Sequence, residues 1–376
     1  MNNIKNRLLE IGFSSELNGE TLLLEYGNNV FDNILNMIDE KLILTGHKKI
    51  KISANDINHR IAHEVGMPQS LYFDSIRKVG VTRYFSREIE AYFRDIQPAR
   101  HEQLQNIELF SRVIKEIINL PIISGKLLIA KEETYYIGVI TSKGIIEIAR
   151  SVLKKDNDGY YIRSYFLSRI LNAIVIYSQD EEGVILSPAV APYVLVILPI
   201  NIAQKGVSKK CKELFNKLVN KGLKVFYDDS GESHVEKHNY YRKIGVPLIV
   251  EIGVKDVESN LLNLFARTNK EFSRIDEKVF IDDVELYLTK MQNDLYKKAL
   301  TFTVNSIRNS SEFSEDKKSN IIVKIQCCEE EKCLEKLEGI KDRIIICPFN
   351  QDSSRTCYFC HSNDCASYYL VKKYQK

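Results

Sequence analysis

The stretch that decides the fold of this chain begins with VLVILPI (194–200) and ends with PLIVEI (247–252). Each of these segments is an apolar run of strand length, which suits a strand buried on both faces. Between them lie a lysine-rich amphipathic segment (209–221), a second strand pattern, GLKVFY (222–227), and a short helical pattern over 240–243. Strand, helix, strand, helix and strand at this spacing predict a compact α/β domain.

The composition is that of a globular chain with several domains. Its 376 residues are 44% hydrophobic and 27% charged, which is ordinary for a chain that buries a core. The net charge of +3 indicates no bulk attraction to DNA or to a membrane, so any polyanion must be bound by local patches. No apolar run reaches the length of a membrane span, and the start, MNNIKNRLLEIGFSSE, lacks the apolar core of a signal peptide. We therefore expect a cytoplasmic protein without DNA or membrane partners.

Cysteine is concentrated near the end of the sequence, where seven of the eight residues lie between Cys327 and Cys365. Four of them form two close pairs, Cys-x4-Cys and Cys-x2-Cys: Cys328, Cys333, Cys357 and Cys360. Two such pairs can surround a zinc ion tetrahedrally, and four protein ligands leave no open position, so the site would be structural. Cys327, Cys347 or Cys365 could replace one of the four, and a set of free thiols without metal is the alternative.

The remaining sequence predicts further elements and two boundaries. An amphipathic helix is expected over Asn29–Leu44, strands and hairpins over 125–148, and a helix over 279–310, whereas 84–108 indicates a proline-containing turn. Boundaries near Gly183 and after residue 310 divide the chain into three domains, 1–182, 183–310 and 311–376.

Residues 183–270 resemble the anticodon-binding domain of class II prolyl-tRNA synthetases. The matching positions are Ala191-Pro192, Pro199-Ile200, Asp228-Asp229, Lys237, Gly245-Val246-Pro247 and Gly253. Two positions differ, because Ser230 and Glu236 stand where the family has arginine and glycine. The cysteine-rich tail resembles the C-terminal domain of the archaeal- and eukaryotic-type enzymes.

Three upstream segments resemble the class II motifs more weakly. They are 19–47, whose family counterpart forms the dimer interface, 93–110 and 168–183. The resemblance implies an α/β protein with a trimmed class II antiparallel sheet and helices, an α/β anticodon-binding domain and a small zinc-binding-like α/β domain. It also implies a homodimer.

The resemblance assigns Arg94 to the ATP α-phosphate and Arg169 to the triphosphate. Ile96 stands where the family has an adenine-contacting glutamate, and Tyr165 stands where a glycine lets adenine approach the sheet. The family's Thr-x-Glu loop has no clear counterpart, because the nearest candidates, Thr82 and Glu88, have the wrong spacing. Arg94 and Arg169 are therefore interpreted as remnants of a degenerate site, with a working nucleotide site as the alternative.

RNA contacts are expected from Lys237, Tyr240, Tyr241 and Lys243, since aromatic rings beside basic groups suit unpaired bases and their phosphates. The lysine-rich run 205–221 is a second candidate. A solvated surface is the alternative for both.

The leading hypothesis is a prolyl-tRNA synthetase-like protein that binds tRNA, or a related RNA or protein partner, with a degenerate aminoacylation site. An active ligase with an altered pocket, which alone would require ATP and Mg²⁺, is the second hypothesis. A dimeric scaffold or regulatory paralogue is the third. No glycine-rich phosphate loop is present, and His59 and His63 lack a third metal ligand nearby.

Overall fold

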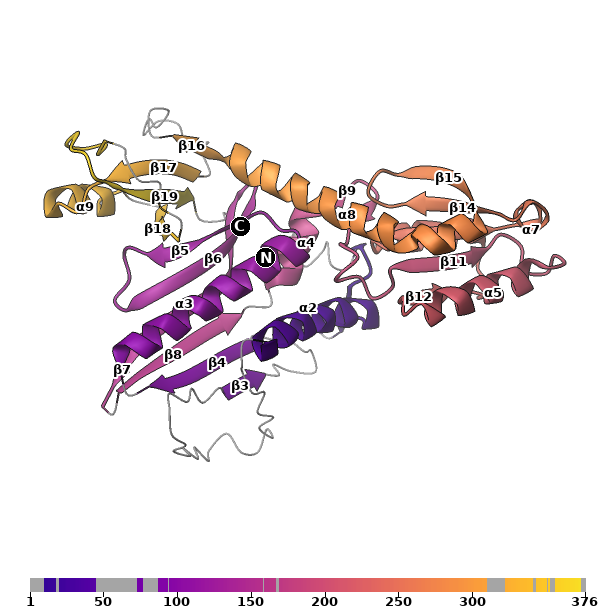
Figure 1. The fold of residues 1–376 in the computed structure, drawn as a ribbon, viewed down its shortest axis with the longest axis horizontal. Coiled ribbons are helices and arrows are strands. Elements are labelled where there is room, and N and C mark those ends of the chain that lie inside the picture. Colours follow the sequence, from indigo (N-terminus) through magenta and orange to yellow (C-terminus); the bar gives the residue numbers. More distant parts are fainter. Residues whose placement is uncertain are drawn as a thin grey trace. The chain divides into compact units, whose positions relative to one another are not determined.

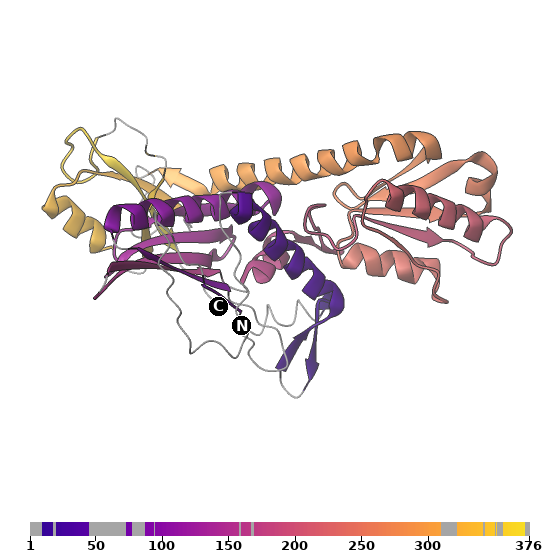
Figure 2. The same cartoon turned by 60° about the horizontal axis from the view of Figure 1, so that its bottom comes forward.

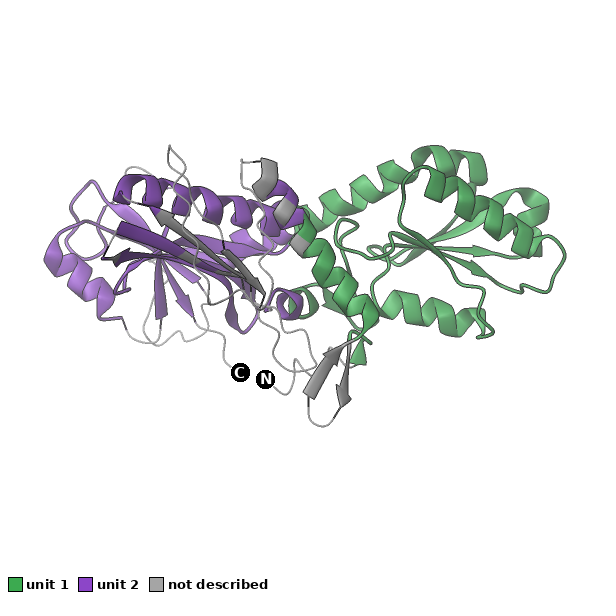
Figure 3. Cartoon of the chain, turned by 90° about the horizontal axis from the view of Figure 1, so that it is seen from below, with its two compact units in different colours: residues 1–36, 117–119, 174–298 green, residues 37–116, 120–173, 299–376 purple. Residues whose placement is uncertain are grey.

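The computed structural model describes residues 10–17, 20–44, 73–76, 87–93, 95–157, 159–166, 169–309, 322–340, 343–349, 351 and 356–372. The chain divides into two compact units, coloured separately in Figure 3. Unit 1 contains Met1–Asn36, Ile117–Asn119 and Ile174–Lys298, and unit 2 contains Met37–Glu116, Leu120–Ala173 and Ala299–Lys376. Each unit has a sheet of its own, and together they confirm the predicted α/β class.

Unit 1 is built on a five-stranded mixed sheet with the order β12-β11-β13-β14-β15 (Figure 1). Its strands are β11 (Leu195–Pro199), β12 (Val225–Tyr227), β13 (Leu248–Ile252), β14 (Leu261–Ala266) and β15 (Glu271–Asp276). The first three are parallel to one another, and β14 and β15 continue the sheet antiparallel. The three strand patterns of the sequence therefore form strands, as predicted, and the structure shows that they run parallel.

Helices cover both faces of this sheet (Figure 2). Leu248, Val250 and Ile252 lie in one core with the apolar sides of α5 (Val207–Asn220) and α8 (Glu277–Ser306). Because side chains alternate along a strand, Glu251 points to the other face, where it meets His238 of α6 (His234–Lys243). A short helix, α7 (Val254–Ser259), follows β13.

Helix α6 begins six residues before the helical pattern expected at 240–243. Ser233 is its N-cap: the Ser233 hydroxyl accepts from the backbone N–H of Glu236, and the Glu236 carboxylate accepts from the N–H of Ser233. This reciprocal cap satisfies two backbone donors and explains the earlier start.

Unit 2 contains a ten-stranded sheet with the order β16-β17-β19-β18-β5-β6-β7-β8-β4-β3. In that order the strands span Ile307–Asn309, Ile322–Cys327, Ala366–Lys372, Arg343–Pro348, Ile122–Leu127, Glu133–Thr141, Gly144–Asp156, Gly159–Phe166, Arg87–Phe93 and Phe73–Ile76. All neighbours are antiparallel except β16 and β17. Strand β18 of the cysteine-rich tail pairs with β5 through Ile346–Leu127, Cys347–Lys126 and Pro348–Gly125, so the tail extends the upstream sheet.

The prediction of a proline-containing turn within 84–108 is wrong. Strand β4 is followed by a helix, α3 (Ile96–Arg112), which ends in a π-helical turn, Val113–Ile117. Pro98 lies in the first turn of α3, where a backbone N–H would have no helical partner, so proline does not break the helix there.

The other described elements are β1 (Ser14–Leu17), β2 (Glu20–Leu23), α2 (Glu25–Leu44), α4 (Arg169–Tyr177), β9 (Gln179–Asp180), β10 (Gly183–Val184) and α9 (Glu331–Glu338). Helix α2 confirms the predicted amphipathic helix, and its apolar residues Val30, Phe31, Ile34 and Ile38 are buried. Thr45–His47 lie outside the described residues. Among the helices that are described, none is both long and apolar enough to cross a membrane.

Candidate functional site

Four cysteines of unit 2 converge in the tail. Cys328 directly follows β17, Cys333 lies on α9, and Cys357 and Cys360 come from the turn that precedes β19. Their four Sγ atoms all lie within 4.8 Å of one another, and those of Cys328 and Cys360 are 3.6 Å apart. The structure thus brings together the four residues that the paired spacing singled out, and the cluster could hold a metal ion.

The surroundings of the cluster favour thiolate at Cys357. Three of the four side chains are buried, and Cys360 is exposed. Burial raises the pKa of Cys357, but the backbone N–H groups of Cys328, Cys360 and Phe359 outweigh it and lower that pKa to about 6. Because a thiolate is the form that binds metal, these donors suit a metal site.

The three spare cysteines of the tail lie around the cluster, and Cys327 and Cys365 are close enough to Cys357 to interact with its sulfur. The thiol of Cys327 donates to the carbonyl of Cys328 at 3.3 Å, and that of Cys365 donates to the carbonyl of Ser362 at 3.4 Å. Cys347 on β18 accepts from Nε2 of Gln351 at 3.1 Å. None of them belongs to the four-thiol cluster.

Two of the four predicted RNA-binding residues are internal. The Lys237 side chain is 2% exposed, and its Nζ donates to the carbonyls of Asp228 and Ser230 and pairs with Oδ1 of Asp228 at 3.2 Å. The hydroxyl of Tyr241, also buried, donates to Oδ2 of Asp228 at 2.9 Å. The predicted RNA contact of Tyr241 would need an exposed ring, and this ring is buried. The three N–H groups of the Lys237 ammonium and the Tyr241 hydroxyl all have partners in Asp228 and Ser230. In this conformation neither side chain has a donor left for a phosphate or a base.

The Asp228 carboxylate is the centre of this buried group. Burial raises its pKa, but hydrogen bonds from Ser230, Tyr241 and Lys237 prevail and lower it below its usual range. The carboxylate is therefore charged at neutral pH and holds the end of β12 to α6.

The other two predicted residues are on the surface. Tyr240 is 48% exposed and Lys243 is also exposed, three residues further along α6. Exposed lysines also occur in the run 205–221, among them Lys205, Lys209 and Lys212, of which Lys209 makes a long ion pair with Glu213 at 3.8 Å.

Arg169, the predicted triphosphate residue, begins α4. Its side chain is 52% exposed and lies 3.8 Å from the carboxylate of Glu147, which also accepts from Arg150 at 2.7 Å. Arg94 lies outside the described residues. Its neighbour Phe93 pairs with Tyr160 at the start of β8, whereas Arg169 follows the end of that strand.

The structure describes some of the positions at which this sequence differs from the family pattern. Ile96, at the adenine-contacting position, packs against the small apolar cluster of Ala99, Leu153 and Ile162. The backbone of Tyr165 pairs with Glu88 and Arg150 in the sheet, but the Tyr165 and Glu88 side chains lie outside the described residues. Thr82, His59 and His63 lie outside them as well.

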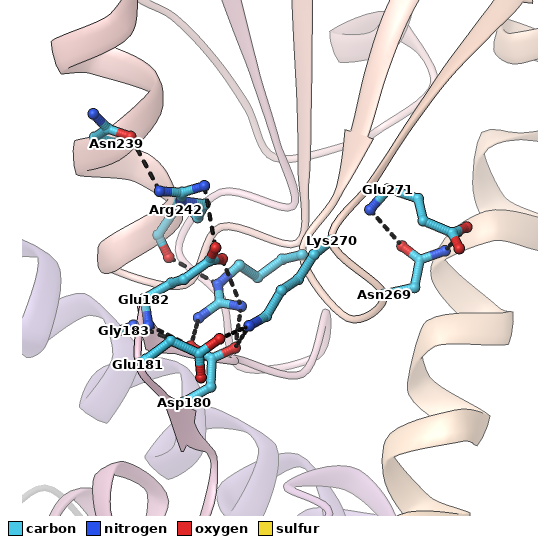
Figure 4. Close-up of polar contacts among 10 residues, drawn as sticks. Asp180, Glu181, Glu182, Gly183, Asn239, Arg242, Asn269, Lys270 and Glu271 are labelled. Atoms are coloured by element: carbon cyan, nitrogen blue, oxygen red, sulfur yellow. Dashed lines mark hydrogen bonds and ion pairs between the residues drawn. The ribbon is translucent and has the colours of Figure 1, made fainter.

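Sequence reasoning missed an ionic group of unit 1 that brings Asp180, Arg242 and Lys270 close together (Figure 4). The Arg267 side chain is 0% exposed and forms two parallel bonds to the Asp180 carboxylate at 2.7 and 2.8 Å. Its Nε donates to the carbonyl of Arg242 at 2.9 Å, and Lys270 pairs with Asp180 at 3.2 Å. The partners are 87 residues apart in sequence, so no local spacing reveals them.

Comparison with known proteins gives a family match for the central segment and more distant relatives that match a larger part of the chain. The family described as "Anticodon binding domain" matches residues 194–290. A proline–tRNA ligase of Clostridium botulinum (strain Loch Maree / Type A3) is 24% identical over 314 residues, covering 74% of this chain and 64% of the relative. A proline–tRNA ligase of Alkaliphilus oremlandii is 26% identical over 316 residues with the same coverage, 74% and 64%. One of Sulfurisphaera tokodaii is 28% identical over 225 residues, or 56% of this chain and 47% of the relative. The match therefore spans less than two thirds of the length of these relatives.

Proposed function

We propose that this chain, which is similar to proline–tRNA ligases and matches an anticodon-binding domain over residues 194–290, is a prolyl-tRNA synthetase-like protein that binds tRNA through that domain. The observation that carries the proposal is the family match over residues 194–290, which span the five strands of the unit 1 sheet and the helices between them. We further propose that this domain extends over 183–310, between a class II-like domain (1–182) and a metal-binding tail (311–376).

The exposed lysines of unit 1 support phosphate contacts. Lys209 and Lys212 lie on α5, and Lys243 ends α6, all with side chains open to solvent. Lys237 is excluded from the proposed surface because its ammonium is buried against Asp228. Each phosphate that a lysine neutralises releases counterions, so affinity should fall as salt rises.

The test is tRNA binding by the full chain at several salt concentrations. We expect Lys209→Glu with Lys212→Glu, and separately Lys243→Glu, to weaken binding and to reduce the slope of log affinity against log salt by about one for each lost contact. Lys290→Glu on α8, an exposed lysine outside these segments, is the matched control. Affinity that is unchanged in all the variants would remove this surface from the proposal.

We propose that the four-thiol cluster holds one structural zinc ion. Cys328, Cys333, Cys357 and Cys360 would be its ligands, and a zinc ion bound by four thiolates supplies ordering energy to a small domain and no reactive position. Metal analysis of protein purified without added metal should give one zinc per chain. The variant Cys357→Ser/Cys360→Ser should lose it, while Cys347→Ser should retain it. Zinc content that is substoichiometric and insensitive to the double substitution contradicts the assignment.

We propose that the aminoacylation site is degenerate. Support comes from Ile96, whose apolar side chain cannot accept a hydrogen bond from adenine and packs against Ala99 and Leu153. Losing one buried hydrogen-bond partner costs about 1–3 kcal/mol. ATP–pyrophosphate exchange, scanned over the twenty amino acids, should stay at background. Exchange that appears with any amino acid and disappears in Arg94→Ala and Arg169→Ala would establish the active ligase instead.

We propose a homodimer that involves Asn29–Leu44. The main apolar residues of this helix are already buried within the chain, so a second copy would contact its remaining surface. A monomer at micromolar concentration in analytical ultracentrifugation would contradict the proposal.

A tRNA-binding role would put the protein in the cytoplasm, an expectation that cell fractionation tests.

A further inference from the structure

The four-thiol cluster is unevenly exposed to solvent. All eight cysteines of the chain lie among the residues that the structure describes, and of these Cys360 alone is exposed. The other three members of the cluster, Cys328, Cys333 and Cys357, are buried. The hydroxyl of Ser362 lies 3.1 Å from the Sγ atom of Cys360, close enough to donate a hydrogen bond to a thiolate. A water-borne oxidant can therefore reach Cys360 more directly than the other three thiols, because oxidation of cysteine follows exposure and thiolate character.

A second thiol of the cluster lies within reach of Cys360. The Sγ atoms of Cys328 and Cys360 are 3.6 Å apart, although the two residues are 32 positions apart in sequence. The two sulfur atoms of a disulfide are about 2.05 Å apart, so these atoms would have to approach each other by about 1.5 Å. Because the Cys360 side chain faces solvent, it can rotate towards Cys328 without displacing buried neighbours.

Hydrogen bonds already join the two segments that carry these thiols. The backbone N–H of Tyr358 donates to the carbonyl of Gln326 at 2.9 Å, and the N–H of Cys328 donates to Sγ of Cys357 at 3.5 Å. Cys328 follows β17, and Cys360 lies in the turn before β19, which pairs with β17. A disulfide between Cys328 and Cys360 would thus link neighbouring segments without moving either strand.

Cys333 differs from the other three thiols because it lies on a helix. It belongs to α9, where Cys333 and Leu337 are buried in the core of the tail. A metal ion bound to the cluster would fasten this helix to the end of β17 and to the turn before β19. A disulfide between Cys328 and Cys360 would keep those two segments together but would leave α9 without its link to them.

We propose that the four-thiol cluster is a redox switch, in which hydrogen peroxide oxidises Cys328 and Cys360 to a disulfide, zinc is released and α9 is freed. This inference rests on the proposed zinc ion and is independent of tRNA binding. It goes beyond a purely structural metal site, because the same four thiols would have two alternative states that order different parts of the tail.

The oxidation can be written as two steps. The Cys360 thiolate attacks one oxygen of the peroxide, the O–O bond breaks, and a sulfenic acid and a hydroxide ion form. The Cys328 sulfur then attacks the Cys360 sulfur, the S–S bond forms, and a second hydroxide ion leaves. Two thiolates have then lost two electrons, and the peroxide has been reduced to two hydroxide ions, which take up protons and become water. With two of its four ligands oxidised, the site no longer holds zinc.

The test uses the full chain, whose zinc content is first measured by metal analysis. Hydrogen peroxide is then added in steps, released zinc is followed with a colorimetric chelator, and the disulfide is located by mass spectrometry of tryptic peptides. Cleavage after Lys332 and Arg355 puts Cys328, Cys333 and Cys360 on three different peptides. We expect about one zinc ion and one Cys328–Cys360 disulfide for each peroxide consumed. Dithiothreitol with added zinc should reverse both changes.

Hydrogen exchange distinguishes the oxidised state from simple loss of metal. In the oxidised protein, exchange should rise in α9, while β17 and β19 keep their protection because the disulfide joins the segments beside them. In reduced protein treated with a chelator, exchange should rise in α9, β17 and β19 alike. The same exchange pattern in both states would overturn the proposal.

Cys327→Ser/Cys365→Ser is the matched control, because it removes two spare thiols of the tail that are outside the four-thiol cluster. It should release zinc and form the Cys328–Cys360 disulfide as the unchanged protein does, and a loss of either response would overturn the proposal. Protein that holds no zinc before oxidation overturns the zinc assignment and this inference together. Protein that holds zinc and keeps it under peroxide, or loses it with a different disulfide, overturns this inference alone.

Discussion

Lys237 and Lys243 stand six residues apart on one helix, yet their side chains have opposite environments. Lys237 is buried with three oxygen contacts to Asp228 and Ser230, and Lys243 is exposed. A buried ammonium is stable only when it is paired, because desolvation of an unpaired charge is expensive. Lys237 can be buried because the fold places the Asp228 carboxylate against it, whereas Lys243 faces solvent.

Replacing Lys237 by methionine should destabilise the protein by about 3–5 kcal/mol, because the Asp228 carboxylate would remain buried without its partner. Lys243→Met is the matched control on the same helix and should change stability by less than about 0.5 kcal/mol. Chemical unfolding of the full chain, followed by circular dichroism, measures both. Equal stability of the two variants would show that the Lys237–Asp228 contact contributes nothing.

Asp180 should make stability depend on pH in the acid range. Although burial raises its pKa, the bonds from Arg267 and the backbone of Glu182 lower it well below the usual range. A carboxyl group with a depressed pKa in the folded state contributes stability above its unfolded pKa, about 3.9, and loses it as pH falls towards the folded value.

We therefore expect Asp180→Asn to be clearly less stable than the unchanged protein at pH 7, since it leaves Arg267 buried with only the Glu182 carboxylate, 3.9 Å away, as a charged partner. That difference should narrow as pH falls from about 4 towards 2. Asp282→Asn on α8, an exposed aspartate, should show no such narrowing. A stability difference for Asp180→Asn that stays constant across this range contradicts the role assigned to the Asp180–Arg267 pair.

At the scale of elements, the backbone of the β9–β10 hairpin packs closely against the end of α6, and the Asp180–Arg267 ion pair also holds the hairpin in place. Gly183 has φ +139°, and a Cβ built on it would lie 2.2 Å from the carbonyl oxygen of Lys243. Only glycine permits both this backbone conformation and this close approach. The hairpin therefore depends on Gly183 and on the Asp180–Arg267 pair together.

Gly183→Ala should destabilise unit 1 by about 2–5 kcal/mol, through the strained φ and the displacement of the Lys243 backbone. Gly231→Ala is the control, because nothing lies within 4 Å of its would-be Cβ and its φ is not in the left-handed region. Thermal unfolding midpoints of the two variants provide the comparison. Similar midpoints would mean that the hairpin can move away from α6 at little cost.

At the scale of the whole molecule, the cysteine-rich tail shares its sheet with upstream strands. Strand β18 lies between β19 and β5 and is hydrogen-bonded to both. A change in the structure of the tail around the four-thiol cluster can therefore reach β5 of the upstream sheet through β18. Unpaired strand edges are prone to pair with other chains, and β18 covers the edge of β5.

Removal of the proposed zinc with a chelator should raise amide hydrogen exchange in β17, β18 and β19, and also in β5, which would lose its neighbour. Strands β11 and β13 of unit 1 should keep their protection and serve as the internal control. Restoring zinc should restore the protection of all four strands. Unchanged exchange in β17–β19 after complete removal of metal would show that the tail is ordered without it.

The sequence by itself determined the elements whose signals are local. The three apolar runs of the central domain, the amphipathic helix α2 and the paired cysteines were predictable because periodicity and short spacing act within one element or one turn. The start of α6 was also encoded locally, in Ser233 and Glu236, although the helical pattern at 240–243 alone did not reveal it.

Only the tertiary structure decided the roles that depend on distant partners. It set Lys237 and Tyr241 against Asp228, joined Arg267 to Asp180 across 87 residues, and paired β18 with β5. A charged or aromatic side chain has the same local pattern whether it faces water or a buried carboxylate. Its environment is fixed by the packing of whole elements, and the free energy of desolvation then determines whether it binds a ligand or holds the fold together.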